Sequence, residues 1–370
     1  MLLKKIKIVQ YKNISNLGFE PHSSINAFTG FNGMSKTNIL DSIHYLCLAK
    51  SNFGRLENNN VMKGHDFFRL EGEFEKNSDL INVTIKVKPP RVKVIQKNGK
   101  DLDKISDHIG DFPVVIITPK DKNSLLENSI ERRKLMDRVM SQTDRMYLEK
   151  LVEYNKWLKQ RNALLKISDI DRYDNLLLDT FDGKMEPLAE YIFEKRKDFI
   201  IKIAPRLSEI YKRISDGAEY PSIEYKSQLE SKKYTELVKE NLKKDLILKR
   251  SNAGIHKDDL IFSLDDMNLK LFASQGQLKS FALSVKLAEF TFLKEQKGYI
   301  PIVILDDVFD KLDNKRVKYL VSLLFDNGFG QVFISDTDKE RVKKIFEDSN
   351  VDYKLFEVQN GNIINECTST

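Results

Sequence analysis

The feature that most constrains the fold is the stretch INAFTGFNGMSKTNILDSIHYLCLAK at residues 25–50. Its first apolar residues predict a short buried strand, and apolar residues then recur at Ile39, Ile43 and Leu46 with the spacing of an amphipathic helix. Between strand and helix stands GFNGMSKT, which matches G-x-x-x-x-G-K-[ST] at every fixed position but one. In that context backbone N–H groups and the positive end of the helix dipole cradle phosphates. The stretch therefore predicts a nucleotide-phosphate site; the alternative is an ordinary turn ahead of a helix.

The phosphate loop supplies most of the predicted nucleotide contacts. Lys36 is expected to reach the terminal phosphates of ATP, and the Thr37 hydroxyl is expected to bind Mg²⁺. Ser35 stands where the motif has its last glycine, and serine tolerates the unusual backbone angles of that position less well. Ser35 is therefore the loop residue most able to weaken ATP binding. The other residues expected to contact the nucleotide are Gly30, Phe31, Asn32, Gly33, Met34 and Asn38.

The composition is that of a soluble globular protein. Hydrophobic residues make up 41% of the 370 positions and charged residues 31%, and no apolar run approaches the roughly 20 residues that cross a bilayer. The opening MLLKKIKIVQ alternates apolar and basic residues, which predicts a strand and not a secretion signal. We therefore expect a cytoplasmic protein with no membrane partner. Cys47 and Cys367 are expected to be a core thiol and a free thiol.

The charge balance permits a nucleic-acid partner without requiring one. A net charge of +6 and an isoelectric point near 8.9 fit contact with a polyanion, and they equally fit a solvated basic surface. The five histidines form no cluster with the spacing of metal ligands, so nucleotide-bound Mg²⁺ is the one metal expected.

The hydrophobic pattern predicts an α/β fold with two domains, one of them discontinuous. Apolar residues recur at helical spacing from 119 to 249, which predicts a helical lobe. An ATPase head at residues 1–118 and 250–370 would flank it, and a polar tail would follow Gly361. The strands expected in the first part of the chain are 2–9, 17–20, 25–28, 67–74, 80–87, 91–96 and 113–118. Those expected in the second part are 246–249, 260–264, 269–272, 302–305 and 331–334.

Two adjacent carboxylates end an apolar strand in IVILDD at residues 302–307. Ligands bind at the carboxyl edge of parallel sheets, so both side chains are candidates for the chemistry of the site. Asp306 is expected to hold Mg²⁺, and Asp307 is expected to polarise the water that attacks the γ-phosphate. Together with the phosphate loop, the pair predicts ATP hydrolysis.

A third candidate segment is ASQGQ at residues 273–277, ahead of a helical pattern. Ser274 and Gly276 would leave a hydroxyl and backbone amides at the start of that helix, which is an anion-binding geometry. A second phosphate site of this kind needs a second phosphate or a second protomer. The alternative is a simple helix N-cap formed by Ser274.

These motifs carry a resemblance that runs nearly the whole length of the chain. The segments resemble the bacterial RecF recombination-mediator family, a relative of the SMC and ABC-type ATPases. Four ordered motifs carry most of it, namely GFNGMSKTNILDSIHYLCLAKS, ASQGQLKSFALSVKLAEF, PIVILDDVFDKLD and QVFISDTD. Two further segments, ERRKLMDRVMSQ at 131–142 and AGIHKDDLIF at 253–262, are also similar to the family.

The resemblance implies both a fold and an activity. The fold would be an ABC-ATPase-like, SMC-head-like P-loop domain with an inserted helical lobe. The activity would be slow, DNA-dependent ATP hydrolysis coupled to dimerisation, with binding of single- and double-stranded DNA. It also implies a role in DNA replication, in the repair of DNA damage and in the SOS response. The partners would be RecR and RecO, which would help to load RecA at single-strand gaps.

The resemblance also implies roles for individual residues. Asp306 and Asp307 would be the Walker B pair, residues 310–313 the D-loop, and Lys12 a basic residue near the nucleotide. Ile255 and Lys257 depart from the family, which has proline and arginine there, and His256 and Asp258 have no assigned role. The signature motif that caps ATP of the opposite protomer would comprise Ser274, Gln275, Gly276 and Gln277.

Three other functions share some of these motifs. A nucleotide-binding subunit of an ABC transporter has the same ATP motifs, but the long helical lobe and the lack of a histidine in ISDTD count against it. Another SMC-like ATPase, for example in phage defence, would have the same head, yet no added nuclease domain is evident. A DNA-binding scaffold that no longer hydrolyses ATP would follow if Ser35 disables the loop.

Overall fold

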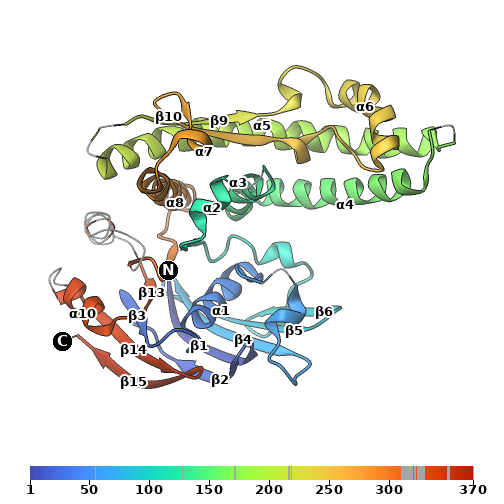
Figure 1. The fold of residues 1–370 in the computed structure, drawn as a ribbon. Coiled ribbons are helices and arrows are strands. Elements are labelled where there is room, and N and C mark those ends of the chain that lie inside the picture. Colours follow the sequence, from blue (N-terminus) through green and yellow to red (C-terminus); the bar gives the residue numbers. More distant parts are fainter. Residues whose placement is uncertain are drawn as a thin grey trace. The chain divides into compact units, whose positions relative to one another are not determined.

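The chain folds into two compact units, shown as a ribbon in Figure 1. Unit 1 comprises Met1–Asp121 and Glu289–Thr370, and unit 2 comprises Lys122–Ala288. The expected head included residues 250–288, which instead belong to unit 2, because a strand of this segment pairs with one from the helical region. The computed structural model describes residues 1–54, 56–126, 129–170, 172–215, 217, 219–309, 320, 322, 330–347 and 351–369.

One sheet of unit 1 is mostly parallel and carries the phosphate loop. Its strand order is β15-β14-β3-β13-β12-β8, with β15 antiparallel at the edge. The inner strands β3, β12 and β13 and the edge strand β8 are buried along their whole length, which confirms the prediction of apolar, doubly covered strands. The bounds are β3 (Ile25–Thr29), β8 (Val114–Ile117), β12 (Ile302–Asp306), β13 (Val332–Asp336), β14 (Tyr353–Gln359) and β15 (Asn362–Thr368).

The second sheet of unit 1 is antiparallel, in the order β2-β1-β4-β5-β6-β7. Helix α1 (Lys36–Leu48) contacts strands of both sheets, so its buried face fills the core between them. Cys47 is buried there and Cys367 is exposed, and both are free thiols, as predicted. The bounds are β1 (Leu2–Tyr11), β2 (Ile14–Phe19), β4 (Phe68–Lys76), β5 (Asp79–Lys88), β6 (Val92–Lys97) and β7 (Lys100–Asp101).

Unit 2 is mainly helical. The long helices α4 and α5 run side by side (Figure 1), and α5 and α6 pack together around a small apolar cluster with α4. A three-stranded sheet in the order β11-β10-β9 completes the unit. The helices are α2 (Asp121–Leu126), α3 (Ser129–Thr143), α4 (Arg145–Ile167), α5 (Asn175–Ile214), α6 (Tyr234–Leu248), α7 (Leu269–Phe272) and α8 (Gln275–Lys297), whose residues from Glu289 on belong to unit 1. The strands are β9 (Pro221–Lys226), β10 (Asp259–Leu264) and β11 (Met267–Asn268).

Several predictions differ from the structure. Residues 246–249 and 269–272 were expected as strands but fall at the end of α6 and in α7, because short apolar runs do not distinguish a strand from a buried helical turn. Strand β9 interrupts the predicted helical region. The predicted polar tail after Gly361 is strand β15, a largely exposed edge strand with few apolar residues to signal it. In the described part of the chain, no helix combines the length and apolar character needed to cross a membrane.

Candidate nucleotide site

The phosphate loop connects β3 to α1 and turns through left-handed backbone angles at three residues. Gly33 and Ser35 both have φ of 84°, and Gly30 has φ of 148°. A Cβ on Gly30 would lie 2.4 Å from the carbonyl oxygen of Val358, so glycine is required there for steric reasons. Phe31, Asn32 and Gly33 are exposed at the tip of the loop. The expected strand, loop and helix are therefore present, and Ser35 occupies a conformation that favours glycine.

Lys36 folds back over its own loop. Its Nζ donates hydrogen bonds to the carbonyl oxygens of Gly30, at 2.6 Å, and Phe31, at 3.0 Å. Burial lowers the pKa of Lys36, while the nearby carboxylates of Asp307, Asp336 and Asp306 oppose that shift. A desolvated cation beside exposed loop amides can bind terminal phosphates strongly, because an ionic hydrogen bond is stronger where water is excluded.

The loop and the Walker B strand meet at Thr37 and Asp306. Thr37 Oγ1 donates to Asp306 Oδ1 at 2.8 Å, although the residues are 269 positions apart. Ser335 Oγ, at the end of the neighbouring strand β13, also donates to Asp306 Oδ1 at 2.8 Å. Burial raises the pKa of Asp306, and these two hydrogen bonds oppose the shift. A hydroxyl and a carboxylate oxygen in contact are ligands that Mg²⁺ accepts, so this pair could hold the metal.

Asp307 follows directly, with a left-handed φ of 49°. Its backbone N–H donates to Ser335 Oγ at 2.9 Å, so the same serine ties both carboxylate residues to the end of β13. Ser335 was not among the predicted site residues. Its position in the apolar run QVFISD, one strand away from IVILDD, could have indicated it, because adjacent parallel strands end at the same edge of the sheet.

Asp336, also at the end of β13, was not predicted either. It is buried and accepts two hydrogen bonds from Arg341 Nη2, at 2.7 and 2.9 Å, and one from the Asp338 N–H at 2.8 Å. Arg341 lies on α10 (Lys339–Glu347), the amphipathic helix that follows. The guanidinium therefore balances a third carboxylate at the sheet edge near Lys36.

Lys12 lies at the turn between β1 and β2 and is bound to a buried carboxylate. Its Nζ is 2.6 Å from Asp41 Oδ2, which also accepts from Tyr11 Oη and Ser51 Oγ at 2.6 Å each. Burial alone would raise the pKa of Asp41, but Lys12 and the other donors hold it below its ordinary value. Asn38, on the first turn of α1, donates from Nδ2 to Asn13 Oδ1 at 2.5 Å on this same turn. The β1–β2 turn thus reaches the start of α1.

The predicted signature residues form a capping box at the start of α8. The Ser274 N–H donates to Gln277 Oε1 at 2.6 Å, and the Gln277 N–H donates to Ser274 Oγ at 3.2 Å. Gln277 Nε2 also donates to Glu219 Oε1 at 2.6 Å, and Gln275 Oε1 accepts from Lys122 Nζ at 3.2 Å. These residues, with Gly276, belong to unit 2, whereas the phosphate loop belongs to unit 1. The predicted D-loop at 310–313 lies outside the described residues.

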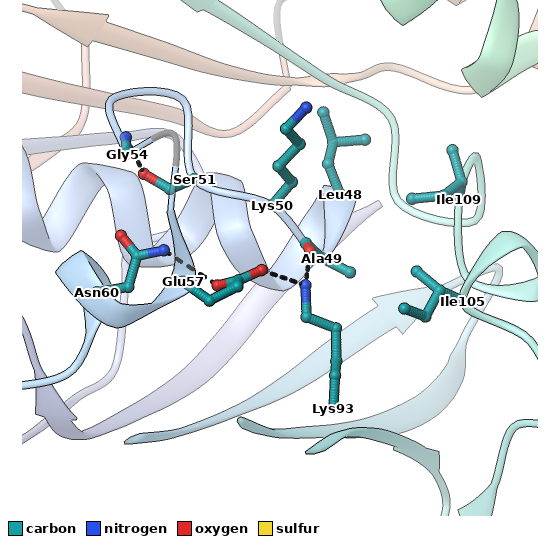
Figure 2. A pocket seen from close by; sticks show the side chains of 10 residues that line it. All are labelled: Leu48, Ala49, Lys50, Ser51, Gly54, Glu57, Asn60, Lys93, Ile105 and Ile109. Atoms are coloured by element: carbon teal, nitrogen blue, oxygen red, sulfur yellow. Dashed lines mark hydrogen bonds and ion pairs between the residues drawn. The ribbon is translucent and has the colours of Figure 1, made fainter. Parts of the chain in front are cut away.

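A separate pocket of about 320 Å³ opens at the other end of α1 (Figure 2). Lys93 Nζ crosses it, donating to Ala49 O at 2.8 Å and pairing with Glu57 Oε1 at 2.5 Å. Apolar side chains, including Ile105 and Ile109, line the facing wall. None of the predicted nucleotide residues lines this pocket, and the 13 residues of α1 set its ends about 20 Å apart. This cavity is therefore distinct from the predicted phosphate loop.

A mixed sheet over an antiparallel sheet, with a loop after β3 that is hydrogen-bonded to the carboxylate at the end of β12, two strands away, defines the class of ABC-type ATPase heads. Comparison with known families identifies the family within this class. The chain belongs to the family described as RecF/RecN/SMC N terminal domain, which it matches over residues 2–363.

Curated relatives match over nearly their full length. The chain is 43% identical over 357 residues to the DNA replication and repair protein RecF of Flavobacterium johnsoniae, covering 96% of this chain and 99% of the relative. It is 37% identical to the protein of the same name from Porphyromonas gingivalis (strain ATCC 33277), covering 98% of this chain and 100% of the relative.

Solved structures of the same family have a similar fold. The recombination mediator protein RecF with ATP, in the RecFOR pathway, matches with a TM-score of 0.88 at 27% identity, covering 100% of this chain and 98% of the other. An Smc head domain from Pyrococcus furiosus matches with a TM-score of 0.56 at 16% identity, covering 100% of this chain and 96% of the other, and so shows the fold alone. The predicted fold class and family are confirmed.

The raised pKa of Asp306 predicts a pH-dependent effect of Asp306→Asn. The pKa of Asp306 is higher in the folded protein than its ordinary value of 3.8 in the unfolded chain. Ionised Asp306 therefore costs stability, and the free energy of unfolding falls as the pH rises above about 4. Asp306→Asn removes that penalty and is expected to raise the Tm at pH 7 by a few degrees, with a smaller gain toward pH 4. Differential scanning fluorimetry without nucleotide or Mg²⁺ measures the change. The exposed Asp79→Asn is the control, and an equal gain at both pH values would contradict the prediction.

Proposed function

We propose that this protein is an ATP-dependent DNA-binding recombination mediator that acts in the cytoplasm in DNA replication and in the repair of single-strand gaps. It would bind single- and double-stranded DNA, dimerise when it binds ATP, hydrolyse ATP slowly, and cooperate with RecR- and RecO-type mediators in loading RecA. Full-length similarity to proteins named for DNA replication and repair supports the process. The observation that carries the proposal is the bond between Thr37 and Asp306, which joins the two halves of the ATP motif set.

The residues present fit MgATP. A Cβ on Gly30 would clash with the carbonyl oxygen of Val358, so glycine is required at the start of the loop, and Phe31, Asn32 and Gly33 after it are open to solvent. Lys36 and the amides of residues 33–37 would hold the phosphates, and Thr37 with Asp306 would hold Mg²⁺. When bound, MgATP supplies the phosphoanhydride bond that is slowly hydrolysed. The side chains and backbone amides of this loop would hold the triphosphate in one orientation.

Several further residues have proposed roles. Asp307 would orient and polarise the attacking water, and Lys12, at the β1–β2 turn, would lie near the nucleotide. The exposed Phe31 and Asn32 at the tip of the loop would border it, as would Met34 and Asn38. Ser274, Gln275, Gly276 and Gln277 would contact the nucleotide of the partner protomer, where a helix start favours anions. The ATPase rate of Ser35→Gly tests the scaffold alternative, and a rate equal to that of the wild type would remove the idea that Ser35 disables hydrolysis.

An exposed basic cluster in unit 2 supports a phosphate-backbone partner. Lys244, Arg250 and Lys257 lie around the loop between α6 and β10, and all three are exposed. Burial lowers the pKa of Lys257, and repulsion from Arg250, Arg133 and Lys244 adds to the effect. Within the described residues, no ion pair neutralises these three exposed side chains. Unpaired cations that repel one another gain most when a polyanion binds.

Charge reversal in this basic cluster is expected to weaken DNA binding. Arg250→Glu with Lys257→Glu should lower the affinity for duplex DNA about tenfold to a hundredfold in 0.1 M salt and reduce the slope of log K against log salt by about 2. The control is Lys100→Glu with Lys104→Glu, which changes the net charge equally on exposed residues of unit 1. Fluorescence anisotropy measures both. Equal weakening by the two double variants would contradict a specific role for the cluster.

The proposed function as a whole is tested by DNA binding and assembly with and without ATP. Anisotropy of a labelled gapped duplex should report binding that falls steeply with salt. Sedimentation velocity should show ATP shifting the protein from monomers toward dimers. If no DNA structure binds and ATP promotes no dimers, the proposal is wrong.

A further inference from the structure

The turn between β14 and β15 lies against the phosphate loop. The Gly361 N–H donates to the carbonyl oxygen of Met34 at 3.3 Å, and the Asn360 N–H lies 3.4 Å from Met34 Sδ. On the same hairpin, the carbonyl oxygen of Val358 lies so close to Gly30, at the start of the loop, that no side chain fits there. The hairpin therefore touches both ends of the phosphate loop, although more than 320 positions separate Met34 from Gly361.

Ser35 directs its side chain toward this turn. Its Oγ is buried and has no hydrogen-bond partner among the described residues, whereas Phe31, Asn32 and Gly33 on the open side of the loop are exposed. A Cβ placed on Gly361 would lie 3.6 Å from Ser35 Oγ and 3.0 Å from Asn13 O. The serine that replaces the loop glycine is thus accommodated on the protein side of the loop, next to a residue that has no side chain.

From these contacts we propose that the Asn360–Gly361 turn is a positioning element of the nucleotide site, which holds the loop in its binding conformation despite serine at position 35. The inference rests on the proposed function, in which this loop binds ATP. Met34 and Ser35 directly precede Lys36, so a shift of the turn moves the lysine and the amides that would bind phosphates. Displacements of about 1 Å at such a site weaken function strongly.

Gly361→Ala tests the inference, and the chain offers a closely matched control. Gly361 has φ of 80° after Asn360 at 49°, and Gly99 has φ of 77° after Asn98 at 49°. Both are Asn-Gly hairpin turns, so alanine carries a similar backbone strain in each. A Cβ on Gly99, however, meets nothing within 4 Å. Binding of a fluorescent ATP analogue should weaken about tenfold in Gly361→Ala and less than about twofold in Gly99→Ala, with similar Tm values.

A second substitution separates positioning from general destabilisation. Ser35→Gly lets position 35 adopt its φ of 84° without strain, so the loop should depend less on the turn for its conformation. The loss of affinity caused by Gly361→Ala should therefore fall from about tenfold in the wild type to below about threefold in a Ser35→Gly background. If the two alanine variants bind the analogue equally, or if Gly361→Ala costs the same affinity in both backgrounds, the inference is wrong. A wild-type protein that binds no ATP would overturn the proposed function instead.

Hydrogen exchange of the wild-type protein gives a test that needs no variant to fold. ATP should slow amide exchange in residues 358–362 together with residues 30–37, while exchange in residues 97–100 at the matched turn stays unchanged. Protection of the loop without protection of the Asn360–Gly361 turn would also overturn the inference.

Discussion

Lys36→Ala is expected to weaken ATP binding more than about a hundredfold, the largest functional effect of any single substitution in the chain. Lys36 is the buried cation of a site that also contains the carboxylates of Asp306, Asp307 and Asp336, which all act on its pKa. Removing it leaves the carboxylates of Asp306 and Asp307 without the cation beside them, so the loop should attract phosphates much less. Isothermal titration calorimetry with MgATP measures the loss.

The fold should survive this substitution. In the structure the bonds of Lys36 Nζ go to its own loop, at Gly30 O and Phe31 O, and not to the core. The Tm of Lys36→Ala without nucleotide is therefore expected to stay within a few degrees of the wild type. Lys50→Ala, an exposed lysine just beyond the other end of α1, is the control and should bind ATP normally. An affinity of Lys36→Ala within about twofold of the wild type would contradict ATP binding at this loop.

The parts of the site that could be predicted are those determined by local sequence. The strand, loop and helix around GFNGMSKT depend on a short apolar run, glycine conformations and a helical period, all of which lie within 26 residues. The pairing of Thr37 with Asp306 followed from a second local pattern, an apolar strand that ends in carboxylates, and from the rule that parallel strands bind ligands at one edge.

The missed parts depend on contacts between distant segments. Ser335 and Asp336 are ordinary residues in sequence, and they join the site because β13 pairs with both β3 and β12. The turn at Asn360–Gly361 carries the same Asn-Gly signal as the hairpin turn at Asn98–Gly99. Strand β15 is exposed along most of its length, so its alternation was too weak to read. The contact between the Asn360–Gly361 turn and the phosphate loop therefore could not be predicted from the sequence.

The segment AGIHKDD, which received no role from sequence, is the structural centre of unit 2. Asp258 is buried and accepts from Arg196 Nη1 at 2.7 Å, Tyr225 Oη at 2.5 Å and Ser227 Oγ at 2.6 Å. Burial raises the pKa of Asp258, and the bonds from Arg196, Tyr225 and Ser227 oppose that shift. His256 Nδ1 lies 2.9 Å from Tyr154 Oη. These contacts join α4, α5, β9 and the loop before β10, which gives His256 and Asp258 a structural role in unit 2.

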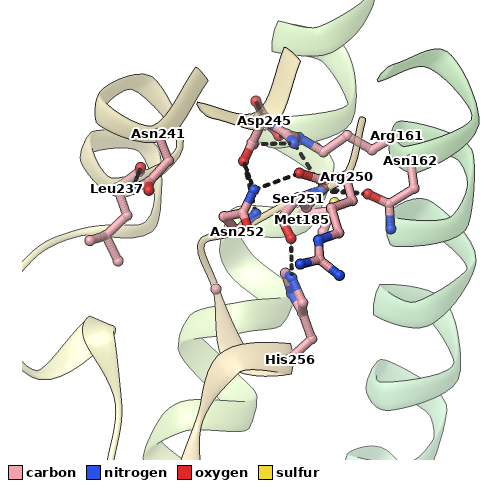
Figure 3. Close-up of polar contacts among 12 residues, drawn as sticks. Arg161, Asn162, Met185, Leu237, Asn241, Asp245, Arg250, Ser251, Asn252 and His256 are labelled. Carbon is pink, nitrogen blue, oxygen red and sulfur yellow. Dashed lines mark hydrogen bonds and ion pairs between the residues drawn. The ribbon is translucent and has the colours of Figure 1, made fainter. Parts of the chain in front are cut away.

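A second buried polar network, centred on Arg161, also lies in unit 2 (Figure 3). Its disruption is expected to have the largest effect on stability. Arg161 on α4 is fully buried, and its Nε donates to Asp182 Oδ1 on α5 at 2.6 Å. Its Nη1 donates to Asp245 Oδ2 on α6 at 2.7 Å and to Ser251 Oγ at 2.8 Å. Asp245 Oδ1 in turn accepts from the Asn252 N–H and Nδ2 at 2.9 Å each. One guanidinium thus links three helices to the loop that carries the exposed basic cluster.

Arg161→Met is expected to lower the free energy of unfolding of unit 2 by about 3–5 kcal/mol, because it leaves the buried carboxylates of Asp182 and Asp245 without their cation. Urea unfolding can be followed through Trp157, the sole tryptophan, which lies on the same helix and so reports on unit 2. Arg145→Met is the matched control, since Arg145 pairs with Glu149 on the exposed face of α4, where an ion pair contributes about 0–1 kcal/mol. Replacing both carboxylates as well, with Asp182→Asn and Asp245→Asn, should recover part of the loss. If Arg161→Met and Arg145→Met unfold at the same urea concentration, the buried guanidinium does not hold the helices together.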